Sequence, residues 1–224
     1  MRMFNESIRS KGRSKVFCGR TVSAAMSLII PVMLTLWLLP REAWAAAAEG
    51  SSFRNIRVLN ASPEKEQEIR AKLSLLPDGV CSAFAADGWF IEVSDERSMC
   101  SRMGVSYDAG RDLTGLTSSR KYILLDGEKD DAAYACLHEM GHFADIYAEE
   151  MTGIRPSRTA EFAALYQAEA PFLAADEGYG AFSAGEYYAE LFKCWFENPQ
   201  ALEAVPASRD YIAAQAAEFA DLNP

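Results

Sequence analysis

The stretch Leu137-His138-Glu139-Met140-Gly141-His142-Phe143-Ala144-Asp145 decides how the second half of this chain is organised. It lies within the longer run 130–150, which contains no proline and, apart from Gly141, no glycine. The whole run is therefore predicted to be one helix. Apolar residues recur along it at positions that share one face, which predicts that this face packs against a core. They are Leu137, Met140, Phe143 and Ile146.

His138 and His142 are four positions apart, which places them on one face of a helix, about 40° out of line. Both imidazoles can therefore reach a single metal ion, and HExxH on a helix is typical of a zinc site. Glu139 lies beside them and can take a proton from the attacking water. The chain has only these two histidines. The run therefore predicts one Zn²⁺ ion held by His138 and His142, with Glu139 as general base.

A catalytic zinc ion needs a third protein ligand, and its fourth position is left to water. The chain has no third histidine, and its cysteines lack the spacing of a zinc site, so the ligand is expected to be an acid of a later helix. Glu161 follows His142 by 19 positions, the HExxH-x18-E spacing of zinc aminopeptidases. Glu186 follows it by 44 positions. Spacing alone leaves both candidates open.

Three elements of the sequence resemble the catalytic domain of anthrax lethal factor and its relatives, a family that includes small secreted Pro-Pro endopeptidases. They are the HExGHxxD pattern within 137–145, Tyr179, and the run 186–192 (EYYAELF). The resemblance implies that Glu186 is the third zinc ligand. It also implies that Glu190 contacts a ligating imidazole and that Tyr179 points its hydroxyl at the reacting oxygen.

Side-chain chemistry agrees with the roles that the resemblance implies. Glu186 and Glu190 share a helix face, and only one carboxylate is needed on zinc. The other can accept the spare N–H of a ligating imidazole and so fix its tautomer, a part that Asp145 can also play. Glu161 has Leu165 four positions later and therefore no partner acid on its face. The Gly-x-Met-Glu-Asn run that an aminopeptidase of that spacing needs is absent from the sequence.

Residues 1–45 have the pattern of a secretory signal peptide. Basic residues crowd the beginning, the uncharged apolar stretch 21–40 follows, and Ala43-Trp44-Ala45 supplies a small-x-small cleavage site. We expect cleavage there and secretion of 46–224 as a single zinc metallopeptidase domain. An uncleaved anchor is the alternative, because about 20 apolar residues can span a bilayer. Pro31 interrupts the stretch and favours the signal peptide.

The charge of the chain bears on its partners. The full sequence has 22 basic and 32 acidic residues, of which 1–45 holds seven and two, so 46–224 carries 15 against 30 and a net charge of −15. Such a charge repels nucleic acid and anionic membrane surfaces and favours solubility. We therefore expect a monomer that acts on a peptide or protein, binds no nucleic acid, and has no stable membrane association once the leader is removed.

The order of predicted elements, strands first and helices second, favours an α+β fold of zincin-like type. It would consist of a small N-terminal mixed sheet, the active-site helix and a helical C-terminal half. A substrate is expected to pair with an edge strand near 114–118. Predicted strands are 53–59, 89–93, 104–107 and 121–125; one helix begins at 62–64 and ends at 77–79, and the others are 130–150, 159–169, 184–197 and 206–222.

Four cysteines follow the leader, and an even number in an exported protein permits two disulfides. Cys81 and Cys100 flank a predicted strand and are the expected pair. Cys136 lies about 200° around the helix from His138 and so faces away from the metal. It can meet Cys194 only if the last helices pack behind the active-site helix.

The function predicted from these patterns is a secreted zinc-dependent endopeptidase. Two alternatives stand beside it. One is a zincin-fold binding module or toxin component that has lost catalysis, and the other is the aminopeptidase that uses Glu161.

Overall fold

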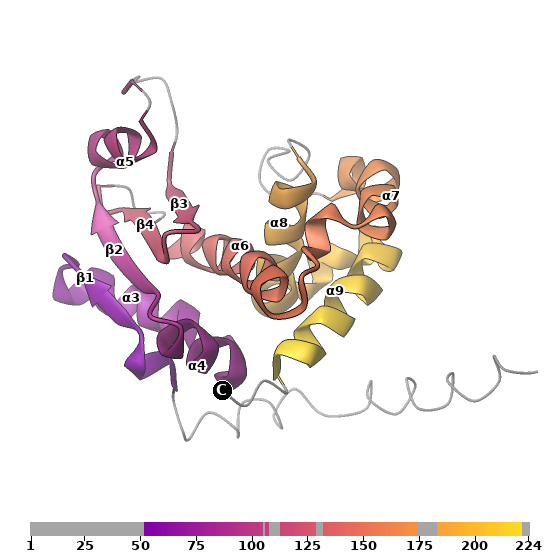
Figure 1. The fold of residues 1–224 in the computed structure, drawn as a ribbon, viewed down its shortest axis with the longest axis horizontal. Coiled ribbons are helices and arrows are strands. Elements are labelled where there is room, and N and C mark those ends of the chain that lie inside the picture. The colour runs from indigo at the N-terminus through magenta and orange to yellow at the C-terminus, as the bar shows by residue number, and fades with distance from the viewer. Residues whose placement is uncertain (1–51, 105, 108–112, 129–131, 174–182, 221–224) are drawn as a thin grey trace, which may run out of the picture. The chain divides into compact units, whose positions relative to one another are not determined.

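The computed structural model describes residues 52–104, 106–107, 113–128, 132–173 and 183–220. Their fold is mixed α and β, mostly helical, with one four-stranded sheet (Figure 1). The strands are β1 (Arg57–Leu59), β2 (Phe90–Ser94), β3 (Gly115–Ser118) and β4 (Tyr122–Asp126). Across the sheet they run β1-β2-β4-β3, with the first three parallel and β3 antiparallel to β4 at one edge. The predicted edge strand near 114–118 is therefore present as β3.

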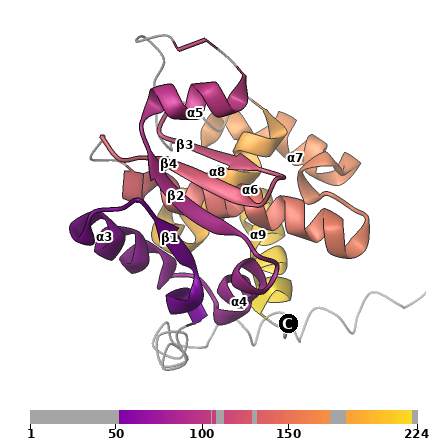
Figure 2. The same ribbon diagram turned by 60° about the vertical axis from the view of Figure 1, so that its left-hand side comes forward.

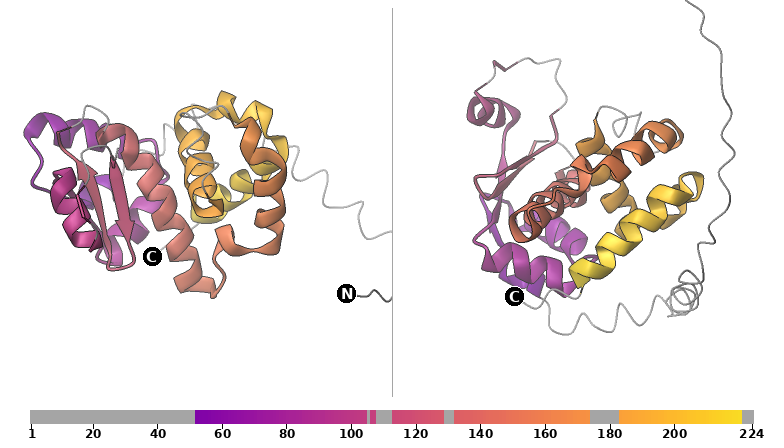
Figure 3. Two further views of the ribbon diagram at one scale, coloured as in Figure 1. Left: turned by 90° about the horizontal axis from the view of Figure 1, so that it is seen from above. Right: turned by 45° about the vertical axis from the view of Figure 1, so that its right-hand side comes forward.

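The helices surround this sheet and continue beyond it. α6 crosses between the sheet on one side and α7, α8 and α9 on the other (Figures 1, 2 and 3). None of the described helices is both long and apolar enough to cross a membrane. The helices are α3 (Pro63–Leu73), α4 (Asp78–Ala86), α5 (Glu96–Met103), α6 (Ala132–Thr152), α7 (Ala160–Glu169), α8 (Ala184–Glu197) and α9 (Pro206–Ala220), with 3-10 turns η2 (Ser52–Asn55), η3 (Pro156–Arg158), η4 (Ala170–Phe172) and η6 (Pro199–Ala204).

The two faces of the sheet meet different helices because successive side chains of a strand point to opposite sides. Ile91, Ile123 and Leu125 join the main hydrophobic core with residues of α3, α4 and α6. Glu92 and Tyr122 point the other way, where they meet the guanidinium of Arg102 in α5, an ion pair in one case and a cation–π contact in the other. The sheet therefore separates α5 from the helices of the main core.

Local sequence signals explain where several helices begin. Ser62 caps α3 by accepting a hydrogen bond from the Lys65 amide, as the sequence predicts, and Ser183 does the same for α8 at the Glu186 amide. The predicted helix 184–197 coincides with α8, and 130–150, 159–169 and 206–222 match α6, α7 and α9 within two residues at each end. The periodic C-terminal half was thus predictable from the spacing of its apolar residues.

Two short helices were not predicted. Pro77-Asp78-Gly79, read as the end of a helix, instead begins α4, and Val80, Cys81 and Phe84 become buried. Asp95 caps α5 by accepting from the Ser98 amide at 2.8 Å, and Gly104 ends that helix with φ of 70°. The predicted strand 104–107 is therefore wrong, since Gly104 has the left-handed conformation typical of a helix end and residues 106 and 107 belong to no strand.

The start of the sheet also differs from the prediction. Of the predicted strand 53–59, only Arg57–Leu59 is extended, because Ser52–Asn55 forms a 3-10 turn in which the Ile56 amide donates to the Phe53 carbonyl. Ser52 is tied to the first turn of α4 through its hydroxyl and amide, both of which donate to Asp78. This contact draws the segment before β1 out of the sheet.

The predicted disulfide Cys81–Cys100 is absent: the four cysteines of the described residues form no disulfide, and all are buried. They are Cys81, Cys100, Cys136 and Cys194. The reason is the sheet between the first two. Cys81 lies in α4 within the main core, with its thiol against the Leu73 carbonyl, whereas Cys100 lies in α5 on the opposite face. Residues that flank a strand in sequence therefore end on different sides of it.

Candidate metal centre

The side chains of His138 and His142 on α6 converge with that of Glu186 on α8. One donor atom from each lies within 4.8 Å of the others, and this is the only such group of three or more His, Cys, Asp or Glu side chains in the described part of the chain. His138 Nε2 is 3.0 Å and His142 Nε2 is 3.4 Å from the same oxygen, Oε2 of Glu186. Two nitrogens and one carboxylate oxygen thus face a common point.

The charges of these groups are coupled. Burial disfavours the ionised form of Glu186, but hydrogen bonds from both imidazoles outweigh burial and hold the pKa of this carboxyl well below its usual range. Burial likewise disfavours the imidazolium of His138, yet its contacts with Glu186 and Glu190 raise its pKa to about 9. The site therefore favours a positive charge between imidazole and carboxylate, where a proton or a metal cation can provide it.

Glu190 supports the far side of the His138 ring. Its Oε2 lies 3.0 Å from His138 Nδ1, and both residues are buried. Burial opposes ionisation of Glu190, but the hydrogen bond with His138 and the ammonium of Lys193 outweigh it and lower the pKa of this carboxyl. A carboxylate on Nδ1 keeps a proton there, so Nε2 is the ring nitrogen that can bind a metal.

α6 and α8 pack as an antiparallel pair, and Gly141 of α6 lies directly against the backbone of Ala189 in α8. A Cβ on this glycine would be 2.8 Å from Ala189 Cα and 2.9 Å from the Ala189 carbonyl oxygen. Both are backbone atoms, which a side-chain rotation cannot move aside. The glycine within the HExxH run thus sets the distance between the helix that carries the two histidines and the helix that carries Glu186 and Glu190.

Glu139 points from α6 toward the edge strand. Its Oε2 is 2.6 Å from the hydroxyl of Thr117, which also lies 2.9 Å from the Glu139 carbonyl oxygen. Gly115, two positions earlier on the same face of β3, leaves room for the carboxylate, since a Cβ there would be 2.5 Å from Glu139 Oε1. Glu139 was predictable from the HExxH run, whereas the contacts of both strand residues were not, because they depend on how β3 packs on α6.

Asp145 is used differently from the prediction. It is completely buried, and its two oxygens accept hydrogen bonds from Arg155 Nε at 2.6 Å, the Ser157 amide at 2.8 Å and the Ser157 hydroxyl at 2.6 Å. These partners belong to the segment that follows α6 and forms η3. Asp145 therefore connects α6 to the segment that follows it, through both of its carboxylate oxygens.

The remaining predicted site residues stand as follows. Tyr179 lies outside the described residues. Glu161 is exposed in the first turn of α7 and is not one of the converging donors.

The donor set fits a zinc ion. Zinc is bound by imidazole nitrogen and carboxylate oxygen, and two histidines with one glutamate form a known set for catalytic zinc. The buried carboxylate on His138 Nδ1 adds the outer support that ligating histidines have. Magnesium and calcium, which prefer oxygen ligands alone, fit the set less well.

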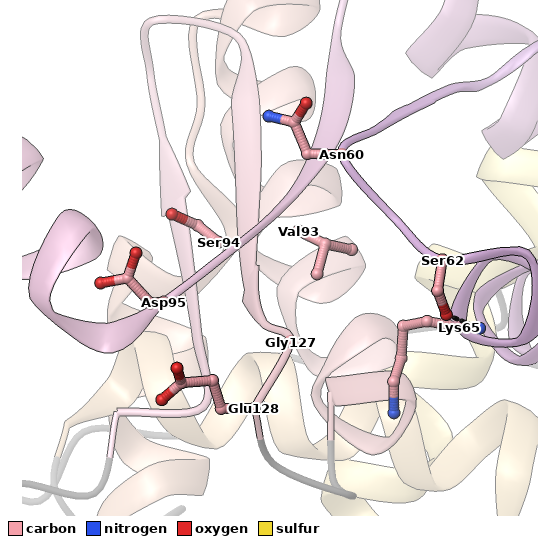
Figure 4. A pocket seen from close by; sticks show the side chains of 8 residues that line it. All are labelled: Asn60, Ser62, Lys65, Val93, Ser94, Asp95, Gly127 and Glu128. Carbon is pink, nitrogen blue, oxygen red and sulfur yellow. Dashed lines mark hydrogen bonds between the residues drawn. The ribbon is translucent and has the colours of Figure 1, made fainter.

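A separate hollow of about 380 Å³ lies at the carboxyl ends of β1, β2 and β4 (Figure 4). It does not contain the histidines or Glu186, and its lining includes no histidine or cysteine. Chemistry therefore points to the converging donors and not to this hollow. Its lining residues are Asn60, Ser62, Lys65, Val93, Ser94, Asp95, Gly127 and Glu128.

Comparison with known proteins finds similarity in structure only. No protein-family model matches the chain, and no curated protein matches its sequence. Among solved structures, the chain is similar to the Pro-Pro endopeptidase PPEP-2 from Paenibacillus alvei, with a TM-score of 0.55 and 17% sequence identity over 73% of this chain and 99% of that one. The likeness is one of fold, and the neighbour is a peptidase.

Proposed function

We propose that this chain is a zinc-dependent endopeptidase of the lethal factor-like type, secreted after removal of residues 1–45. The observation that carries the proposal is the convergence of His138, His142 and Glu186 beside the buried carboxylate of Glu139. The structural likeness to a Pro-Pro endopeptidase supports a peptide as the substrate. The signal-like leader and the charge of −15 for residues 46–224 support export and a soluble monomer.

In this proposal His138, His142 and Glu186 hold the ion. A zinc ion bound there supplies Lewis acidity, which polarises a carbonyl and makes water a better nucleophile at neutral pH. One oxygen of the Glu139 carboxylate accepts the proton of the attacking water, and the same group returns that proton to the leaving amine. Thr117 holds the Glu139 carboxylate at 2.6 Å during both transfers. Tyr179 stabilises the negative oxygen that forms, a role that rests on the resemblance.

The position of β3 supports cleavage within a chain rather than at its end. β3 is the edge strand of the sheet and lies against Glu139. An extended peptide can pair with such an edge through its backbone and continue past the reacting bond in both directions. An aminopeptidase instead needs groups that bind a free amino terminus, and its candidate ligand Glu161 is exposed on α7.

The test is hydrolysis of a peptide library by residues 46–224, with Pro-Pro sequences included because of the structural neighbour. We expect internal cleavage that a zinc chelator abolishes and added zinc restores. Glu139→Ala should keep its zinc yet lose about 100-fold or more in turnover, because it removes a proton carrier and no ligand. Zinc binding without any cleavage would favour the inactive binding module, and release of single N-terminal residues would favour the aminopeptidase.

A further inference from the structure

Lys193 is the only lysine or arginine that is buried in the described part of the chain. Its side chain is 5% exposed, on the turn of α8 that follows Glu190. A lysine is almost never fully buried unless it is paired, because removing its charge from water is costly. The position of this ammonium therefore requires a reason in its surroundings.

The surroundings connect Lys193 to the metal centre. Its Nζ lies 3.1 Å from Glu190 Oε1, while the other oxygen of that carboxylate lies 3.0 Å from His138 Nδ1. The ammonium also lies over the ring of Tyr134, 3.4 Å from its centroid, within the range of a cation–π contact. Tyr134 precedes His138 by one turn of α6. The contacts Tyr134–Lys193 and His138–Glu190 are therefore neighbours along the interface of the two antiparallel helices.

The charges explain what such a pairing does. Glu139, Glu186 and Glu190 place three carboxylates around the two imidazoles, and Glu190 is the most deeply buried. The ammonium of Lys193 compensates the charge of Glu190 and occupies Oε1, so Oε2 is directed at His138. The thiol of Cys194, 3.7 Å from the same Oε1, is a weak donor and cannot compensate a charge.

We propose that Lys193 is a positioning residue of the metal centre: it holds the Glu190 carboxylate, through which it orients His138 for binding the ion. The inference rests on the proposed function, in which His138 is a zinc ligand. It predicts that the effect of Lys193 on the metal passes through Glu190 and requires a positive charge.

The experiment measures the zinc dissociation constant of residues 46–224 by competition with a chromophoric chelator. Lys193→Met, which keeps the length of the side chain and removes its charge, should weaken zinc binding about tenfold, as loss of a group behind a ligating histidine does. Lys193→Arg should restore most of the affinity. Lys72→Met is the matched control. Lys72 lies in α3 and pairs with Glu197 of α8, the helix that carries Lys193, and it does not touch Glu190. It should bind zinc like the unmodified protein.

The decisive comparison is the double variant. In a Glu190→Gln background, Lys193→Met should change zinc affinity by less than about twofold. If Lys193 acts through the Glu190 carboxylate, the effects of the two substitutions on zinc affinity are not additive. An equal loss in both backgrounds, or a loss after Lys72→Met as large as after Lys193→Met, would overturn the proposal. So would a Lys193→Met protein with normal affinity. An unmodified protein that binds no zinc would instead refute the proposed function, and this inference with it.

Folding provides a second readout, followed by circular dichroism without metal. If Lys193→Met does not fold, the double variant with Glu190→Gln should fold, because the neutral amide no longer needs a cation beside it. If the double variant also fails to fold, Lys193 serves the fold independently of Glu190 and the proposal is wrong.

Discussion

The hydroxyl of Thr117 lies 2.6 Å from Oε2 of Glu139, so the edge strand and the active-site helix meet at the proposed general base. A substrate that pairs with β3 would therefore contact the same strand that holds this carboxylate. In the proposed function, binding and proton transfer would thus depend on the same strand, and this dependence can be tested.

Thr117→Val removes the hydroxyl and keeps the shape of the side chain. A hydrogen bond to a charged group contributes about 1.5–3 kcal/mol, so turnover should fall by roughly tenfold or more. Zinc affinity should stay unchanged, because Thr117 contacts no proposed ligand. Steady-state kinetics with a cleaved peptide measures the effect, and Thr117→Ser should recover most of the rate. Equal turnover in the valine variant would show that Glu139 needs no such support.

Gly141→Ala would force α6 and α8 apart, because the new methyl group would be 2.8 Å from Ala189 Cα. In an unobstructed helix this change is stabilising by about 1 kcal/mol. Here we expect weaker zinc binding, measured by chelator competition, because the separation moves Glu186 away from both histidines. The matched control is Gly185→Ala on α8, where the added Cβ meets only the Ser183 hydroxyl at 3.7 Å. Normal zinc affinity in Gly141→Ala would mean that the helices adjust without moving the ligands.

Asp145→Ala should destabilise the fold rather than the metal site. Removing one partner of a buried ion pair costs about 3–5 kcal/mol, and Arg155 and Ser157 would both lose an acceptor. Urea unfolding of the metal-free protein measures this loss. Glu149→Ala, which removes a half-exposed partner of the same Arg155, should cost less than about 1 kcal/mol. A large drop in zinc affinity with intact stability would instead restore the predicted role beside His142.

The four cysteines of residues 46–224 should be free thiols that resist modification in the folded protein. Burial raises the pKa of Cys81 to about 12, and the thiolate is the reactive form, so alkylation at neutral pH should be slow. In denaturant all four should react. Mass spectrometry of the unreduced protein measures both states, and a Cys81–Cys100 cross-link would contradict the described fold.

The parts of the fold that were predictable from sequence are those with strong local patterns. The apolar spacing of 130–150 and 184–197 predicted α6 and α8, and the His-x-x-x-His spacing placed two donors on one face. The short helix α4 was missed because Pro77-Asp78-Gly79 serves as a helix start, although the same residues commonly end one. Whether such a Pro-Asp-Gly run begins or ends a helix depends on which neighbouring residues become buried, and that is decided by the tertiary structure.

The residues of the candidate site were likewise only partly predictable from the sequence. The role of Glu186 came from the resemblance, since spacing alone left Glu161 open, and of these two acids the structure brings Glu186 to the two histidines. The contacts of Gly115 and Thr117 depend on how a strand packs against a helix, which no local pattern encodes. Lys193 carried a detectable signal, a cation three positions after Glu190 on a helix, but its burial is a property of the fold. The role of Tyr179 stays a prediction.

If the donors of α6 and α8 hold zinc as proposed, metal supply would also determine how long the folded protein survives. An ion that binds the native state and not the unfolded chain stabilises it by mass action, about 2.7 kcal/mol at a free concentration one hundred times the dissociation constant. His142 and Glu186 are separated by 44 positions, so the ion would act as a reversible cross-link between two helices that are distant in sequence. Zinc starvation would then open this helix pair more often and expose its backbone to cleavage, so that an endopeptidase without its metal becomes a substrate for others.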